Sequence, residues 1–121
     1  MILLSLLFSL SVQAGSVSKC QDLTGSTSAT ASFTPANGEV VFFQRLSASA
    51  TSATGSKGGV FWDGSLVEAW TGDKVVVYGD NEAAYTFTGD GVKKLELKIE
   101  NTSASTVYRV CGNLAFKTSL E

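Results

Sequence analysis

The stretch VKKLELKIE, residues 92–100, alternates apolar and charged side chains with a period of two. In an extended strand one face would carry Leu95, Leu97 and Ile99, and the other would carry Lys94, Glu96, Lys98 and Glu100. A helix would scatter these apolar residues around its circumference. The pattern therefore predicts a β-strand with one face in a core and the other in water.

Short runs rich in Val, Phe, Tyr, Trp and Thr, separated by Gly, Asp or Asn, surround this stretch from Gly38 to the C-terminus. This rhythm is typical of an all-β chain. Residues 38–46 predict a central strand that is covered on both sides in its first half. Further strands are expected at 74–78, 84–88, 106–111 and 114–116, and the aromatic side chains Tyr85 and Phe87 should share one face. No run after residue 14 has a helical period, so we expect no helix longer than about two turns.

Two turns are expected from glycine-containing motifs. The Asp63-Gly64 dipeptide readily adopts positive φ at both turn positions and predicts a type I′ hairpin. The motif Gly89-Asp90-Gly91 lacks the third glycine of a dinucleotide fingerprint, and a strand rather than a helix follows it. We interpret it as a hairpin turn that leads into the strand at Val92.

Length and composition set the architecture. A chain of 121 residues with 44% hydrophobic and 17% charged residues suits one globular domain. We predict an antiparallel β-sandwich of jelly-roll or related Greek-key type, with about seven to nine strands and little or no helix, over residues 15–121. Residues 47–59 contain only Ser, Ala, Thr, Gly and Lys, which indicates either a long loop or two strand ends of small residues. Such strands suit flat, closely packed surfaces and favour pairing with neighbouring chains.

The N-terminal segment, residues 1–14, is apolar and uncharged. Its apolar run is too short to span a membrane as a helix, which needs about 20 residues. One interpretation is a secretory signal cleaved after Ala14, and the other is an ordered arm that packs on its own domain or on a neighbouring subunit. In the second case the subunit interface consists of Ile2, Leu3, Leu4, Leu6, Leu7, Phe8, Leu10 and Val12.

The two cysteines, Cys20 and Cys111, lie near the two ends of the predicted domain. A disulfide between them would tie both ends of the sandwich together in an oxidising compartment. The alternative is two separate buried thiols. With no His and only two Cys, a structural zinc site cannot be assembled.

The charge pattern and the missing histidine exclude several functions. A net charge of −2 lacks the basic field that attracts nucleic acid. The absence of His removes the usual general base and the usual activator of a serine nucleophile. We therefore expect no enzymatic activity, no cofactor and no nucleic-acid partner.

Two candidate sites lie in or beside the acidic segment 63–90, which holds six acidic residues and one Lys. Asp80, Asn81 and Glu82 are weak calcium candidates, although acids in turns more often bind the backbone than a metal. An aromatic platform for a glycan would combine Trp62, Trp70 and Tyr78 with Asp63 and Asn81. The alternative is that Trp62 and Trp70 are core residues of two adjacent strands.

The segment FTGDGVKKLELKIENTS, residues 87–103, resembles the C-terminal strand pairs of small β-sandwich proteins on phage virions, of the decoration or fibre type. It covers 17 of the 121 residues. The resemblance implies a non-catalytic subunit that is repeated on a symmetric surface and works through subunit or receptor contacts.

Together these features predict a structural or surface-binding subunit of a symmetric assembly, such as a virion or an extracellular filament. Its partners would be further copies of the chain or capsid and filament neighbours, and its location the virion surface or the extracellular space. The alternative is a secreted, monomeric, glycan-binding or adhesin-like module.

Overall fold

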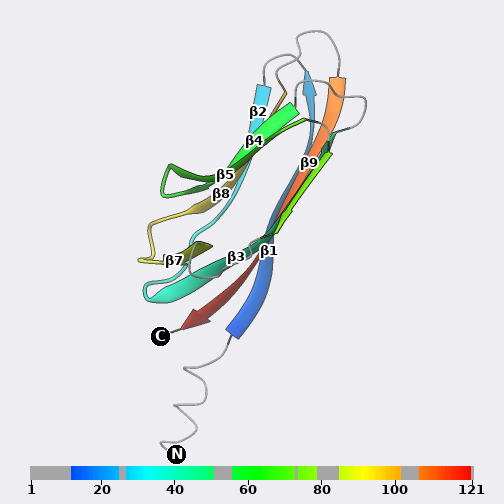
Figure 1. Ribbon diagram of the computed structural model, residues 1–121. Coiled ribbons are helices and arrows are strands. Elements are labelled where there is room, and N and C mark those ends of the chain that lie inside the picture. The colour runs from blue at the N-terminus through cyan, green and yellow to red at the C-terminus, as the bar shows by residue number, and fades with distance from the viewer. Residues whose placement is uncertain are drawn as a thin grey trace, which may run out of the picture.

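Two antiparallel sheets face each other in the computed structural model, which describes residues 12–24, 27–50, 56–72, 74–78, 85–101 and 107–120. The strands are β1 (Val12–Thr24), β2 (Thr27–Phe33), β3 (Glu39–Ala50), β4 (Ser56–Trp62), β5 (Ser65–Thr71), β6 (Lys74–Tyr78), β7 (Thr86–Thr88), β8 (Leu95–Asn101) and β9 (Val107–Leu120). Sheet A has the order β1-β9-β3-β6, with β7 also paired to β3, and sheet B has the order β2-β8-β4-β5. Figure 1 shows these two layers. No helix occurs within the described ranges beyond one helical position at Tyr85.

The strand order is that of a jelly roll. Strand β6 pairs with residues 45–49 of β3 and β7 pairs with residues 40–42, while β9 occupies the other edge of β3. Both short strands therefore run in the same direction along one edge of β3 and together take a single position in sheet A. Counted this way, the order is that of the double Greek key of a jelly roll. The predicted all-β sandwich is confirmed.

Strand β8 supplies the centre of the core, as its alternation predicts. Leu95, Leu97 and Ile99 are fully buried, whereas the charged residues between them are half-exposed. The strand starts at Leu95 rather than at the expected Val92, which lies in a bend and is 74% exposed. On the facing sheet, a Cβ at Gly112 would lie 3.1 Å from Leu97 and 3.2 Å from Ile99, so these side chains fill the space above the glycine.

Strand β3 changes its alternation at a bulge. The register with β9 shifts between Phe43 and Arg45, so that Gln44 is the extra residue. For this reason Leu46 is buried on the same side as Val41 and Phe43. The strand is central, as expected. Val40 and Val41, which point to opposite faces of its first half, are both buried, whereas Arg45 on the outer face of its second half is exposed.

The Asp63-Gly64 hairpin is confirmed. Both residues have positive φ, 49° and 84°, and they connect the paired strands β4 and β5. The second expected hairpin is wrong, because β7 belongs to sheet A and β8 to sheet B. The motif Gly89-Asp90-Gly91 therefore carries the chain from one sheet to the other. Residues 87–101 accordingly span both sheets.

The small-residue stretch 47–59 contributes strand ends, one of the two expected arrangements. Strand β3 continues to Ala50 and β4 starts at Ser56. The two expected C-terminal strands, 106–111 and 114–116, form the single strand β9. Small residues also permit close packing in sheet B, where the Trp70 side chain covers Gly58, its register partner on β4.

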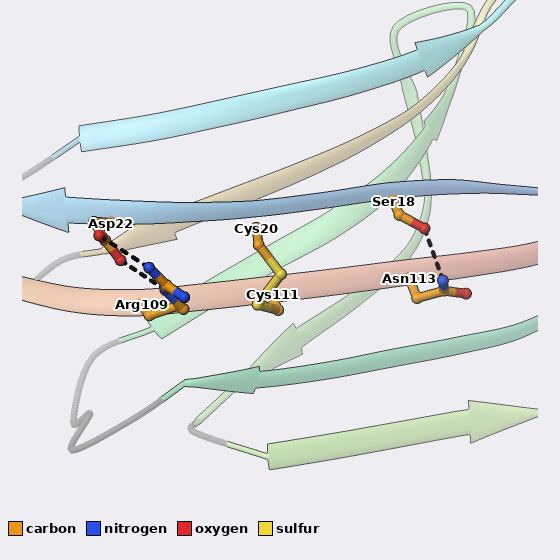
Figure 2. The surroundings of a disulfide bond; sticks show 6 residues. All are labelled: Ser18, Cys20, Asp22, Arg109, Cys111 and Asn113. Carbon is orange, nitrogen blue, oxygen red and sulfur yellow. Dashed lines mark hydrogen bonds and ion pairs between the residues drawn. A yellow bond between two sulfur atoms is a disulfide. The ribbon is translucent and has the colours of Figure 1, made fainter.

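A disulfide joins Cys20 and Cys111. The two residues are register partners on β1 and β9, so the bond links neighbouring strands of one sheet rather than opposite ends of the sandwich. Figure 2 shows the disulfide between two further pairs across the same strands, Asp22 with Arg109 and Ser18 with Asn113. Cys20 is exposed and Cys111 half-buried, so the bond lies on the outer face of sheet A rather than in the core.

The first strand begins at Val12, whose register partner is Ser119. The other expected interface residues, Ile2 to Leu10, lie outside the described residues. Within the described ranges, no helix is long and apolar enough to span a membrane.

We predict that loss of the disulfide lowers the free energy of unfolding by about 2–5 kcal/mol, because the bond restricts the unfolded chain over a sequence separation of 91 residues. Urea unfolding of Cys20→Ser/Cys111→Ser measures the change. Reductant should lower the midpoint of the unmodified chain and leave that of the double variant unchanged. Equal midpoints with and without reductant in the unmodified chain would contradict the prediction.

The contact between Gly58 and Trp70 gives a second prediction. A Cβ at position 58 would overlap both the Trp70 ring and the Lys98 carbonyl oxygen. Gly58→Ala should therefore cost about 1–3 kcal/mol of stability through overpacking. Thr71→Ala, at an exposed position on β5, is the control and should change the thermal midpoint little. An equal loss of stability in both variants would contradict the prediction that the contact with Trp70 and Lys98 restricts the size of residue 58.

Candidate functional site

The outer face of sheet A is built from small side chains near its centre. Register pairs place Ser18 beside Asn113 and then Ser47, and the next row places Cys20 beside Cys111 and then Ser49. The Asn113 amide donates a hydrogen bond to the Ser18 hydroxyl at 2.7 Å. A shallow hollow of about 290 Å³ lies over these rows. Val76, 51% exposed, also lines it and gives the small polar face an apolar contact point.

Charged side chains lie at one end of this face. The Arg109 guanidinium contacts Asp22 at 2.9 Å, and this hydrogen bond together with the positive charge lowers the pKa of Asp22. The same contact raises the pKa of Arg109. Both side chains are exposed, so solvent screens the pair.

The outer face of sheet B has a different chemistry. Its β8 side chains are Glu96, Lys98 and Glu100, and Lys57 of β4 forms a salt bridge of 3.4 Å with Glu100. The Lys98 ammonium lies 4.7 Å from the centre of the Phe61 ring. Long charged side chains of both signs are typical of a sheet face in water. The two outer faces of the sandwich are therefore not equivalent.

A second hollow, which we call the end pocket, lies where the β4–β5 hairpin approaches β7. Its volume is about 420 Å³, and its lining residues are Trp62, Asp63, Ser65, Leu66, Val67, Tyr85, Phe87 and Lys93. The Trp62 and Phe87 rings stack at 5.2 Å, and these residues belong to different sheets. In Figure 1 the hairpin tip and the segment between β7 and β8 lie on the same side of the molecule.

The backbone around the end pocket is fixed by hydrogen bonds. The Asp63 amide donates to the Lys94 carbonyl oxygen at 2.9 Å, which joins the hairpin tip to the segment before β8. One Asp90 carboxylate oxygen accepts the amides of Val92 at 2.8 Å and Lys93 at 2.7 Å. These hydrogen bonds, first that from Lys93 and then that from Val92, lower the pKa of Asp90. Lys93 therefore extends from an ordered turn.

Tyr85 connects the end pocket to the core. Its ring packs edge-on against Phe43 at 5.1 Å between ring centres. Its hydroxyl donates to a Glu68 carboxylate oxygen at 3.1 Å, across from sheet B. The pocket wall is thereby held from both sheets.

The structure brings together only part of the predicted glycan platform. Trp62 and Asp63 line the end pocket, whereas Trp70 is buried in the core and is not part of the pocket. Tyr78 ends β6 in sheet A, and Asn81 lies outside the described residues. Sequence reasoning missed Ser65, Phe87 and Lys93 as partners of Trp62, although the alternation over 84–88 already placed Tyr85 and Phe87 on one face.

No metal centre emerges among the described residues, where no group of three or more Cys, Asp and Glu side chains is placed to hold an ion. The calcium candidates Asp80, Asn81 and Glu82 lie outside these residues. Asp90, by contrast, has the backbone-capping role that is common for acids in turns.

Comparisons with known proteins identify no family. No family model matches the chain, and no curated protein matches it. A solved structure, dimeric latent PorU from Porphyromonas gingivalis, aligns with a TM-score of 0.34 and 11% identity. The alignment covers 88% of this chain, which spans 13% of that much longer one. A similarity at this level carries no inference about function.

We predict that the Asp90 carboxyl titrates below its ordinary value of 3.8. Because its pKa is lowered in the folded state, its stabilisation is present above about pH 4 and is lost as the pH falls through the folded-state pKa. An NMR pH titration should show the Val92 and Lys93 amide signals moving together at that midpoint. In Asp90→Asn this step should disappear, and a midpoint at or above 3.8 in the unmodified chain would contradict the assignment.

Proposed function

We propose that this chain is a non-enzymatic structural subunit that packs through the outer face of sheet A against further copies of itself, on a virion surface or in an extracellular filament. The observation that supports this proposal most directly is the difference between the outer faces of sheet A and sheet B. Sheet B presents Lys57, Glu96, Lys98 and Glu100 to solvent, whereas the centre of sheet A presents serines, the disulfide and the exposed Val76. Small side chains lose little conformational entropy in a contact and allow two sheets to approach closely.

The charges on sheet A support this packing. At one end the charges of Asp22 and Arg109 already neutralise each other. Lys74, the register partner of Ser49, lies on the edge strand β6 and so at the border of this face. Arg45 and Lys117 lie toward the other end of the same face and would remain at the rim of a contact centred on Ser47 and Asn113. A neutral, closely packed centre with a charged rim is the usual anatomy of a stable interface.

The disulfide supports an oxidising location, because such bonds persist in secreted proteins and on virion surfaces. The jelly roll adds support by analogy of fold alone, since capsid and lectin domains both use it. In this proposal the apolar run over residues 2–12 adds a second contact with a neighbouring subunit.

An intact-mass measurement of the native protein tests whether residues 1–14 are cleaved, and the position of β1 says what cleavage would change. Val12, Gln13 and Ala14 pair with β9, so cleavage after Ala14 would remove the first three register pairs of β1. A native mass that begins at Gly15 would eliminate the arm contact. It would leave the sheet A contact as the only basis of assembly.

Assembly is tested by light scattering of the full chain over a wide range of concentration. We expect oligomers of the unmodified chain, and we expect Ser49→Arg to shift them to monomers, because it places a long cation beside the disulfide. The matched control is Ala69→Arg, an exposed position on sheet B, which should leave the oligomers intact. A monomeric unmodified chain, or equal effects of both variants, would overturn the proposal.

A further inference from the structure

We propose that the end pocket binds a neutral pyranose sugar, such as a terminal hexose of a surface glycan. This inference does not depend on assembly. The end pocket lies between the two sheets at the hairpin end, whereas the proposed packing face is the outer surface of sheet A. Both functions can therefore belong to one subunit.

The size and walls of the pocket fit a sugar ring. Its volume of about 420 Å³ lies within the usual range for small-molecule sites, about 300–1,000 Å³. Trp62, Tyr85 and Phe87 supply aromatic surface, and all three are half-buried, so ring area remains accessible. Aromatic rings offer a flat apolar surface to the C–H side of a pyranose at little entropic cost.

The polar groups of the pocket supply both kinds of hydrogen bond that sugar hydroxyls need. The Lys93 ammonium is a donor, the Asp63 carboxylate is an acceptor, and the Ser65 hydroxyl can do either. In the described part of the chain neither Lys93 nor Asp63 has a side-chain ion-pair partner. On the outer face of sheet B, by contrast, Lys57 is paired with Glu100 and Lys98 lies over Phe61.

The balance of charge favours a neutral ligand over an acidic one. Asp63 lines the pocket together with Lys93, and Glu68 lies next to it through its hydrogen bond with Tyr85. A carboxylated sugar that approached Lys93 would meet these two carboxylates. A neutral sugar can accept from Lys93 and donate to Asp63 at the same time.

Hydrogen bonds within the protein hold the pocket walls in place. The hydrogen bond from the Asp63 amide to the Lys94 carbonyl oxygen fixes the distance between the hairpin and the turn that carries Lys93. The Asp90 carboxylate fixes that turn from within. Little ordering is therefore required on binding, which favours affinity.

The experiment is a titration of the full chain with methyl glycosides of neutral hexoses and, in a parallel arm, with sialic and uronic acids. Saturation-transfer NMR and tryptophan fluorescence report binding. We expect saturable binding of at least one neutral sugar, insensitive to added salt. Binding of acidic sugars alone, or of no sugar in either arm, would overturn the proposal.

Variants then place the site. Lys93→Gln should weaken binding about tenfold by removing a charged donor, and the matched control Lys94→Gln, the next residue but outside the pocket, should leave it unchanged. Asp63→Asn keeps a residue that tolerates positive φ while removing the charge, and it should also weaken binding. Trp62→Ala should abolish binding, with near-ultraviolet circular dichroism to check the fold. If that variant does not fold, the Lys93→Gln and Asp63→Asn variants test the site without it. Equal losses of sugar affinity in Lys93→Gln and Lys94→Gln would refute the site.

Discussion

The packing of β8 on β9 is the contact on which the rest of the sandwich depends. Each of these strands lies inside its sheet, with β2 and β4 on either side of β8 and with β1 and β3 on either side of β9. Leu97 and Ile99 reach Gly112, where a Cβ would be only 3.1–3.2 Å away. The missing side chain lets the centres of the two sheets approach, and the neighbouring strands close the core around Phe43, Leu46 and Leu114.

The disulfide works with this core rather than replacing it. It connects β1, an edge strand that contributes Val17 to the core cluster, to the central strand β9. Because the bond lies on the outer face of sheet A, it takes no space from the apolar interior. It also places two sulfur atoms among serines on the face that we propose for packing, where long side chains would keep a neighbour away. One covalent bond thus stabilises an edge strand, and its short side chains do not project far from the outer face of sheet A.

Local patterns allowed part of this structure to be predicted. The alternation over residues 95–100 and the conformational freedom of Asp63-Gly64 are properties of adjacent residues, and both appear as expected. The sheet to which a strand belongs depends on distant partners. For this reason Gly89-Asp90-Gly91 looked like a hairpin turn although it joins two sheets. Two separate strands at 74–78 and 84–88 were expected, but their common position along one edge of β3 depends on distant partners in the same way, as does the register shift at Gln44.

The candidate site also depends on contacts between distant residues, which the sequence pattern does not reveal. Trp62 and Trp70 lie on adjacent strands of one hairpin, and each is followed by a polar residue. Their different environments follow from register. Trp70 faces Gly58 and fills the space left by the glycine, whereas Trp62 faces Leu95 at the end of the sheet, where Phe87 of the other layer reaches it. Trp70, although it lies on the edge strand β5, is core because its ring packs over Gly58, whereas Trp62 at the hairpin end of the sandwich keeps part of its ring accessible. The aromatic pocket is therefore a product of where the jelly roll ends, and its polar residues come from the turns that close that end.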